Sequence, residues 1–335
     1  METGAGGTTT SRRAQIARMR RVALAALDRY ELPPGRLTFV AHGENTTFRH
    51  DSAAGRFLVR VHRPQRHGRG VDSAAAISSE LTWLRAIRTE TDLHVPEPLT
   101  AADGATTVEA AAAAGETRVC SVLRWMDGRL LERSARPVHL RRLGAAMALL
   151  HHQADGWTPP AGFVRIRWDH EAFFGDAMVY GETSAADCWA LLPKEARTRF
   201  EAVAARTADL DRLDDVGLVH ADLHLGNAVF HRGEVGLIDF DDCGTGPRLY
   251  DLAVALWELR DEDGYQVFRD ALLDGYRQHR AIDVSRLDDL IAVRQVSFDL
   301  WATGMAQVNP SFADRLDRVH RWSLKMLDLL ETPSR

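Results

Sequence analysis

The spacing of apolar residues divides this chain into a strand-rich first third and a helix-rich remainder. Apolar residues at helical spacing predict a helix over residues 11–30, which a proline-glycine cluster ends. Short apolar runs separated by turn sequences predict three strands, at 37–41, 46–50 and 56–62. A second amphipathic helix is predicted over 72–89.

The segment 106–125 contains two conflicting signals. Its alanine run favours a helix by intrinsic propensity, but the run precedes Gly-Glu-Thr and an apolar segment that alternates like a strand. We therefore predict a β-hairpin, with the alanines in its first strand. A long helix is predicted near 137–152. From about residue 155 onward we expect only helices, apart from strands at 218–220 and 235–240.

Together these elements predict an α+β fold with two lobes. A small lobe over 11–125 would contain an antiparallel sheet and one main helix, and a larger, mostly helical lobe would follow over 126–335. Residues 1–10 are rich in glycine and threonine, and we expect them to form a disordered tail. At 335 residues, the chain is long enough for two such lobes.

Composition excludes several classes of protein. Apolar residues make up 45% of the chain and charged residues 27%, and no segment reaches the roughly 20 consecutive apolar residues of a membrane helix. The N-terminal residues lack the apolar core of a secretory signal. The three cysteines form no Cys-x-x-Cys pair, which argues against a disulfide framework or a thiolate zinc site. We therefore expect a cytoplasmic protein that binds no membrane.

Charge is unevenly distributed along the chain, whose net charge is −5. Residues 1–70 are rich in arginine, whereas residues 209–270 are rich in aspartate and glutamate. A uniformly basic nucleic-acid-binding protein would not show this asymmetry. The asymmetry is compatible with an anionic cofactor held by metal and carboxylates, and equally with solvated helix faces of opposite sign. Lysine occurs only at Lys194 and Lys325, so the predicted small lobe contains none.

Two polar motifs in the second half carry the candidate chemistry. The first is LVHADLHLGNAVF, residues 218–230, and the second is GLIDFDDCGTGPRLYDLAVAL, residues 236–256. Because each motif contains a short apolar strand, a hairpin would bring Asp222, Asn227 and Asp239 together at one end of the paired strands. Carboxylate and amide oxygens suit Mg²⁺, which in proteins usually bridges to substrate phosphates. The pattern therefore favours phosphoryl transfer.

These motifs resemble those of a known family. HADLHLGN followed by LIDFDD is similar to the catalytic and metal-binding loops of the aminoglycoside phosphotransferase/choline kinase family, within the protein-kinase-like superfamily. The segment DFDDCGTGP followed by YDLAVAL most resembles the branch with stress-response kinase A and homoserine-kinase-like enzymes. In the N-terminal lobe, HGENTTFRH resembles the phosphate-covering hairpin and FLVRVHRP the third strand. The resemblance covers roughly residues 37–305 and implies a bilobal kinase-like fold.

The resemblance also implies roles for individual residues in the first motif. Asp222 is implied as the catalytic base that takes the proton of the acceptor hydroxyl, and His220 as a residue that braces the loop. His224 stands where protein kinases carry a lysine near the transferred phosphate. It is either a phosphate contact or an ordinary hydrogen-bonded loop histidine. Asp251, after the second motif, is expected to be a helix N-cap or a loop anchor.

Further roles are implied for the two cofactors, Mg²⁺ and ATP. Asn227 and Asp239 are the implied Mg²⁺ ligands, with Asp241 as an auxiliary ligand. Residues implied at the nucleotide are Gly43 and Asn45 in the hairpin, Arg60 on the third strand with its partner Glu80 on the following helix, and the backbone from Arg124 to Met126 at the adenine.

Two departures from the family pattern affect these expectations. Position 60 is arginine where the phosphate-orienting residue is usually lysine. A guanidinium can still pair with Glu80 and bind phosphate, although its bulk changes the geometry. Only eleven residues separate Asp239 from Asp251, and no Ala-Pro-Glu follows, which leaves little room for a regulated activation segment. We therefore expect an ATP- and Mg²⁺-dependent phosphotransferase with a small-molecule hydroxyl acceptor.

Several alternatives stay open at the level of sequence. The main ones are a stress-response Ser/Thr protein kinase and a non-catalytic nucleotide-binding pseudokinase. A dinuclear metallohydrolase and a haloacid-dehalogenase-type phosphatase fit less well, because further strand-end histidines and alternating βα units are missing. The acidic stretches LDRLDD and ELRDEDG could attract a cationic acceptor, such as an aminoglycoside or an amino alcohol, and hydroxy-amino acids are also open. Candidate acceptor-site residues are Trp168, Asp169, Phe174, Trp301 and Met305, with ordinary core packing as the alternative.

Overall fold

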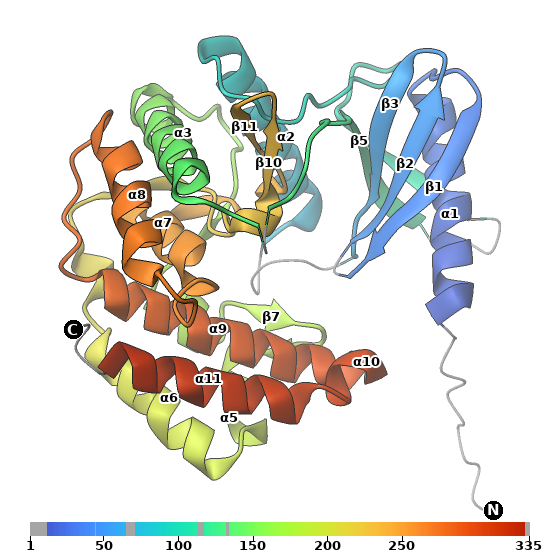
Figure 1. Ribbon diagram of the computed structural model, residues 1–335. Helices are drawn as coiled ribbons and strands as arrows, with labels where there is room; N and C mark the ends of the chain where they lie inside the picture. The colour runs from blue at the N-terminus through green and yellow to red at the C-terminus, as the bar shows by residue number, and fades with distance from the viewer. Residues whose placement is uncertain (1–11, 44, 65–70, 113–116, 132–133, 332–335) are drawn as a thin grey trace, which may run out of the picture. The chain divides into compact units, whose positions relative to one another are not determined.

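The computed structural model describes residues 12–43, 45–64, 71–112, 117–131 and 134–331. The chain forms two compact units (Figure 1). The first contains the described residues of Met1–Gln65 and Pro96–Trp125, and the second those of Arg66–Val95 and Met126–Arg335. The predicted α+β class is confirmed. The tail predicted over 1–10 lies outside the described residues, and the helix of 73–90 packs with the second unit.

The first unit is a five-stranded antiparallel sheet with one helix. The strand order is β1-β2-β3-β5-β4. All of the elements predicted for this unit are present, including the alanine-rich hairpin strand. Its elements are α1 (Arg12–Arg29), β1 (Gly35–His42), β2 (Thr46–Ser52), β3 (Gly55–Val61), β4 (Thr107–Ala111) and β5 (Thr117–Arg124).

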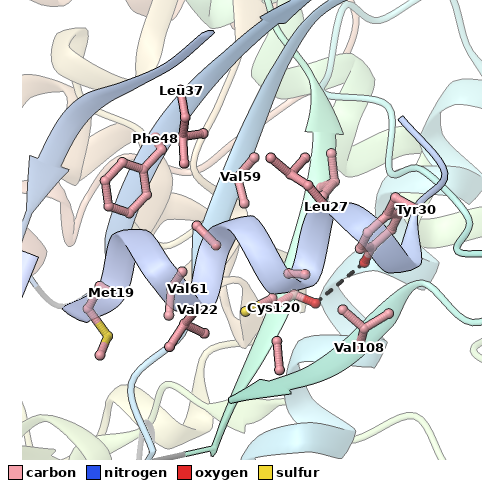
Figure 2. Packing of buried hydrophobic residues seen from close by; sticks show 14 of the residues in the cluster. Met19, Val22, Leu27, Tyr30, Leu37, Phe48, Val59, Val61, Val108 and Cys120 are labelled. Atoms are coloured by element: carbon pink, nitrogen blue, oxygen red, sulfur yellow. Dashed lines mark hydrogen bonds between the residues drawn. The ribbon is translucent and has the colours of Figure 1, made fainter. Parts of the chain in front are cut away.

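Helix α1 covers one face of this sheet and closes its core (Figure 2). Val22 and Leu27 of the helix lie against Phe48 and Val59 of the strands, and all four are almost completely buried. Each such side chain stabilises the unit by about 1.5–3 kcal/mol through its transfer from water. At the end of the helix, the Tyr30 hydroxyl donates to the backbone oxygen of Thr106 at 2.7 Å, which ties α1 to the start of β4.

The second unit is mostly helical and contains short strands near the candidate site. No helix in the described part of the chain has the length and apolar character needed to span a bilayer. The elements are α2 (Ser73–Glu90), α3 (Pro137–Gly156), β6 (Ile166–Arg167), α4 (His170–Phe174), β7 (Val179–Tyr180), β8 (Thr183–Ser184), α5 (Ala185–Leu191), α6 (Lys194–Arg206), η1 (Leu210–Arg212), β9 (Val216–Val219), η2 (Leu225–Asn227), β10 (Ala228–His231), β11 (Glu234–Leu237), η3 (Phe240–Asp242), β12 (Gly244–Pro247), α7 (Arg248–Trp257), α8 (Tyr265–Arg277), α9 (Leu287–Val308), α10 (Pro310–Ala313) and α11 (Leu316–Glu331).

The prediction of helices alone after residue 155, with two exceptions, is wrong. The structure adds β6, β7, β8, β10 and β12 to the two expected strands. Strands of two to four residues are too short to show an alternating pattern, and β12 has the sequence Gly-Thr-Gly-Pro, which reads as a turn. Tertiary pairing overrides this local preference, because β12 lies between β9 and β6 in a three-stranded sheet.

Helices α3 and α8 lie side by side (Figure 1), and their backbones come close together at two points. The contact depends on two glycines, one on each helix. A Cβ atom at Gly144 would lie 2.0 Å from the backbone oxygen of Leu272, and one at Gly275 would lie 1.9 Å from that of Arg141. Because backbone atoms cannot move aside as a flexible side chain would, glycine is the residue that permits this spacing.

We predict that Gly144→Ala destabilises the protein by about 2 kcal/mol, because the added methyl group overpacks a backbone contact. Urea unfolding monitored by circular dichroism would measure the change. Gly156→Ala is the matched control on the same helix, because a Cβ there meets nothing within 4 Å. Equal stability of the two variants would contradict the close-contact explanation.

Candidate active site

A hairpin brings the two polar motifs together, but its first strand is not the predicted strand of 218–220. It consists of β10 and β11, in which Ala228 pairs with Leu237. Just beyond this pair, the backbone N–H of Ile238 donates to the backbone oxygen of Asn227 at 2.9 Å. Asn227 and Asp239 therefore leave the hairpin at the same end. The strand before Asp222, β9, does not belong to this hairpin and pairs with β12 instead.

Asp222 and Asn227 are in direct contact within the loop of residues 220–227. The amide Nδ2 of Asn227 donates to the Asp222 carboxylate oxygen Oδ2 at 2.9 Å and to its backbone oxygen at 2.8 Å. Both bonds use the amide nitrogen, so the amide oxygen Oδ1 of Asn227 is left to bind another group. A spacing of five residues thus places a carboxylate and an amide oxygen side by side, as the chemistry predicted for this motif requires.

The shape of this loop depends on Asp251, a completely buried residue of α7. Its carboxylate accepts the backbone N–H of His220 at 2.9 Å and that of Ala221 at 2.6 Å. Its Oδ2 also lies 2.9 Å from Nε2 of His151. Ala221 has a φ of 65°, a left-handed conformation that disfavours any residue with a Cβ. Asp251 is therefore a loop anchor; the helix N-cap is Pro247.

His220 joins the loop to the strand that leads to Asp239. Its Nε2 donates to the backbone oxygen of Ile238 at 3.0 Å, and its Nδ1 accepts the backbone N–H of Asp222 at 3.3 Å. The ring is fully buried and lies against Phe240, with 4.4 Å between centroids. These contacts fit the bracing role expected for His220.

Arg294 and His224 flank the carboxylate of Asp222, and Glu258 lies on the other side of His224. The Arg294 guanidinium donates to Asp222 Oδ1 at 2.5 Å, and His224 Nε2 lies 3.7 Å from Oδ2. Glu258 in turn lies 3.4 Å from His224 Nδ1. Burial favours a neutral Asp222, but Arg294, His224 and His220 outweigh it and hold the pKa of Asp222 below its ordinary value. Asp222 is therefore a carboxylate at neutral pH.

His224 is held between two carboxylates. Burial lowers the pKa of its imidazole, but the hydrogen bond to Glu258 and the charge of Asp222 raise it more, so the net direction is upward. The backbone N–H of Gly226 lies 3.2 Å from the same Nδ1 that faces Glu258. Nδ1 can therefore accept from Gly226 when the ring is neutral and donate to Glu258 when the ring is protonated. The geometry keeps both predicted roles of His224 open.

The second motif forms a short turn around Phe240. Asp239, at the head of this turn, has a φ of 64°, which aspartate tolerates better than most residues. Phe240 is buried and packs edge-to-face on Trp83 of α2. Asp239 is solvent-exposed, whereas Asp241 is buried. The exposed Asp239 carboxylate and the Asn227 amide oxygen are hard oxygen donors at one hairpin end, a donor set that fits Mg²⁺.

This turn is fixed by two side chains that precede and follow β6. Arg165 donates to the backbone oxygens of Asp241 and Cys243, and also to that of Ala76 on α2 at 2.9 Å. Trp168 donates from Nε1 to the backbone oxygen of Asp242 at 2.8 Å. Trp168 is thus buried support for the turn, which favours the packing alternative over an acceptor contact.

Other candidate acceptor residues are also packed. Phe174 and Met305 are buried, and Asp169 caps α4 by accepting the backbone N–H of Ala172. Trp301 is partly exposed and packs on Phe298 and Phe312. Within the described residues, no cluster of three or more His, Cys, Asp or Glu side chains has the arrangement of a metal centre.

The predicted nucleotide-binding residues lie in both units. Gly43 and Asn45 are in the β1–β2 turn, where Asn45 Oδ1 accepts the backbone N–H of Arg63 at 3.3 Å. Arg60 on β3 and Glu80 on α2 are both almost completely buried. Their pairing stays a prediction.

At the predicted adenine contact, two of the three backbone N–H groups are already used. Those of Arg124 and Trp125 donate to Glu97 and Arg56. Met126 follows directly, and its side chain lies close to Gly236 of β11. Contact of this segment with adenine stays a prediction.

Two residues of the candidate site were missed at the level of sequence. Arg294 is 72 residues from Asp222, and Arg165 is 76 residues from Asp241. Neither belongs to a motif, and in a chain with this much arginine neither stands out. An arginine directly after the apolar run Leu290–Val293 is a sequence signal that could have pointed to Arg294.

A small antiparallel-sheet unit and a mostly helical unit with two acidic loops define a kinase-like phosphotransferase fold. Residues 36–289 match the Phosphotransferase enzyme family (APH). An uncharacterized protein of Deinococcus radiodurans is 32% identical over 296 residues, which cover 84% of this chain and 81% of that protein. The chain therefore belongs to this phosphotransferase family.

Solved structures show the same fold. A microcompartment-associated aminopropanol kinase has a TM-score of 0.73 at 24% identity, with 93% of this chain and 96% of that one covered. An amicoumacin kinase in complex with AMP-PNP, Ca²⁺ and Ami has a TM-score of 0.72 at 21% identity, with 92% of each chain covered. A choline/ethanolamine kinase family protein from Mesorhizobium loti has a TM-score of 0.62 at 18% identity, covering 95% and 96%. At these identities the likeness is one of fold.

We predict that Asp251→Asn destabilises the protein by about 3 kcal/mol at pH 7, because an amide cannot accept two N–H groups and pair with His151 at once. Burial favours neutral Asp251, but its bond to His151 outweighs this and lowers the pKa of Asp251. The stabilisation is therefore complete above the ordinary aspartate pKa and lost as pH falls through the lowered value.

Urea unfolding of both proteins between neutral and acidic pH would measure this difference. Asp274→Asn is the control, because Asp274 makes only an exposed ion pair with Arg141. A stability difference between wild type and Asp251→Asn that stays constant on acidification would contradict the anchoring carboxylate.

Proposed function

We propose that this protein transfers the γ-phosphoryl group of ATP, with Mg²⁺, to a hydroxyl group of a small-molecule acceptor. The observation that carries the proposal is the direct hydrogen bond between Asp222 and Asn227, in a loop that His220 ties to the residue before Asp239. A base and two hard oxygen ligands on adjacent loops are what phosphoryl transfer needs.

Asp222 would accept the proton of the acceptor hydroxyl. At the same time the hydroxyl oxygen would bond to the γ-phosphorus, and the bond between that phosphorus and the ADP oxygen would break. The low pKa of Asp222 keeps it in the required ionised form. Asn227 and Asp239 would hold Mg²⁺, with Asp241 as auxiliary ligand. Bound Mg²⁺ would neutralise phosphate charge. Arg60 would orient the phosphates and would pair with Glu80, while Gly43, Asn45 and the backbone of 124–126 would contact the nucleotide.

An amino alcohol is the acceptor class that we favour. The carboxylate of Glu258 is partly exposed and lies one imidazole ring away from Asp222, so it could hold an ammonium group while the acceptor hydroxyl faces Asp222. Hydrogen bonding to His224 overcomes the effect of burial and lowers the pKa of Glu258, which keeps it anionic. Aminopropanol kinase and the choline/ethanolamine kinase family, which share this fold, are named for amino alcohols.

The other acidic stretch expected to attract a cation has a different environment. Asp215 in LDRLDD pairs with Arg280, and Asp209, just before this stretch, pairs with Arg286. Arginine neutralises both of these carboxylates, whereas Glu258 borders His224 next to Asp222, so the stretch that contains Glu258 better supports a cationic acceptor.

A stress-response protein kinase is the alternative function. The segment between Asp239 and Asp251 favours a small acceptor, because it consists of η3, β12 and the start of α7 and contains no extended activation loop. A pseudokinase is the third possibility, in which nucleotide would bind without transfer.

We predict that wild-type protein consumes ATP in a Mg²⁺-dependent manner with amino alcohols such as ethanolamine and 1-amino-2-propanol. A coupled ADP-release assay would compare these with aminoglycosides, hydroxy-amino acids, sugars and a generic protein acceptor. Phosphorylation of the protein acceptor alone would favour the protein-kinase alternative. Binding of AMP-PNP without any turnover of ATP would overturn the transferase proposal.

We predict that Asp222→Asn lowers kcat by about 1000-fold and leaves nucleotide affinity unchanged, because it removes only the proton acceptor. Asp239→Ala should instead abolish the increase in AMP-PNP affinity on adding Mg²⁺, which calorimetry would measure. Asp274→Ala, at an exposed position, is the control for loss of a carboxylate. Full turnover in Asp222→Asn would refute the base assignment.

A further inference from the structure

Arg294 reaches Asp222 from a distant part of the second unit. It lies on α9, and its guanidinium NH2 group donates to Asp222 Oδ1 at 2.5 Å. The side chain is only 15% exposed, so this ion pair is largely shielded from water. An ion pair of this kind constrains two side chains far more strongly than an exposed one.

The guanidinium also rests on an aromatic ring. Its central carbon lies 4.8 Å from the ring centroid of Trp257, in the geometry of a cation–π contact. Trp257 is buried at the end of α7, and its Nε1 donates to Gln295 at 2.7 Å. Gln295 is the neighbour of Arg294 on α9. Arg294 and the residue that accepts the hydrogen bond of the Trp257 ring therefore lie on the same helical turn.

A buried chain of hydrogen bonds extends this support to the C-terminal helix. Gln295 donates to the Ser323 hydroxyl at 2.8 Å, and that hydroxyl donates to Asp299 at 2.6 Å. All three residues are almost completely buried. Each donor in this chain has a defined acceptor, so the Trp257 ring has one orientation. Trp257 is therefore held in place independently of Asp222 and offers the guanidinium of Arg294 a fixed ring.

The two carboxylate oxygens of Asp222 are thus fixed by different elements. Oδ2 accepts from Asn227, five residues along the same loop, and Oδ1 accepts from Arg294 on α9. Two donors on different oxygens set both the position and the rotation of the carboxylate plane, whereas Asn227 alone would leave it free to turn. Each oxygen still has a second lone pair for the acceptor hydroxyl.

We propose that Arg294 is a positioning residue that fixes the carboxylate plane of Asp222 for proton acceptance. The inference rests on the proposed function, in which Asp222 is the base. In the transfer step the acceptor O–H bond breaks as its oxygen bonds to phosphorus, the bond to the ADP oxygen breaks, and the proton moves to Asp222. Arg294 takes no part in bond making and acts only through Asp222, whose carboxylate plane it orients.

Arg294→Met and Arg294→Lys test this role through the split between kcat and KM. Turnover would be measured by ADP release, with ethanolamine or 1-amino-2-propanol as acceptor and with water as acceptor. We expect Arg294→Met to lower kcat by about 100-fold, the usual effect of a misplaced catalytic group, with KM for ATP unchanged. Arg294→Lys should recover part of this loss, because an ammonium can still donate to Oδ1.

A double-mutant cycle separates this role from general structural support. If Arg294 acts through Asp222, adding Arg294→Met to Asp222→Asn should leave the residual turnover unchanged. A further 100-fold loss in the double variant, or an unchanged kcat in Arg294→Met, would overturn the inference. Arg286→Met is the matched control. Arg286 is the N-cap residue of α9, the helix that carries Arg294. It pairs with Asp209 and Asp289, so its loss should leave kcat unchanged.

Failure of the inference and failure of the proposed function give different results. If wild type shows no ATP turnover, or if Asp222→Asn is fully active, the proposed function fails and the inference fails with it. If Asp222→Asn is inactive while Arg294→Met is as active as wild type, only the role of Arg294 is refuted. Thermal unfolding of each variant checks that it is folded. If Arg294→Met does not fold, Arg294→Lys is used to test the role of Arg294.

Discussion

The candidate site depends on one buried carboxylate, that of Asp251. It accepts two consecutive backbone N–H groups, from His220 and Ala221, and thereby holds Ala221 in a left-handed conformation. Such a conformation costs on the order of 1–3 kcal/mol for a residue with a Cβ, and charge-assisted hydrogen bonds are strong enough to offset it. The reversal of the chain at Ala221 turns Asp222 away from β9, toward Asn227. Without it, the five-residue spacing of the motif would not bring these two side chains into contact.

Much of the fold follows from the sequence because its signals are local. The amphipathic helix of 12–29 and the strands of the first unit bury one face each. The spacing of their apolar residues predicts this directly. The hairpin at 107–124 was predictable although alanine favours helix, since its second strand alternates clearly. The short strands of the second unit were not predictable, because β12 owes its conformation to β9 and β6 and not to its own residues.

The candidate site shows the same difference between residues that local motifs predict and residues that only tertiary packing brings in. Asp222, Asn227 and Asp239 stand in compact motifs, so spacing alone indicates that they converge. Arg294 could not be found in this way, because its proximity to Asp222 arises from the packing of α9 against α7. The sequence also does not show which acidic residues pair with a basic side chain. Asp215 and Glu258 look alike in the chain, but the first pairs with Arg280, whereas the second borders His224 next to Asp222.

The near absence of lysine affects how the second unit is held together. A guanidinium offers five donors in a fixed plane, so one arginine can join several elements at once. Arg165 joins the turn of the second motif to α2, and buried Arg248 joins Leu218 of β9 to Asp155 of α3. Each of these arginines binds oxygens on separate elements that a single ammonium could not reach together.

The glycine contact between α3 and α8 has a consequence for the site. His151, which pairs with Asp251, belongs to α3, and Tyr276, whose hydroxyl lies 2.8 Å from the other ring nitrogen of His151, belongs to α8. The distance between the two helix axes therefore fixes where the imidazole can stand, and with it the carboxylate beneath the loop. Gly144 and Gly275 carry no side chain and touch no reactant, yet they set the spacing on which the position of Asp222 depends. In this fold the geometry of the candidate site is determined partly by how closely two backbones can approach.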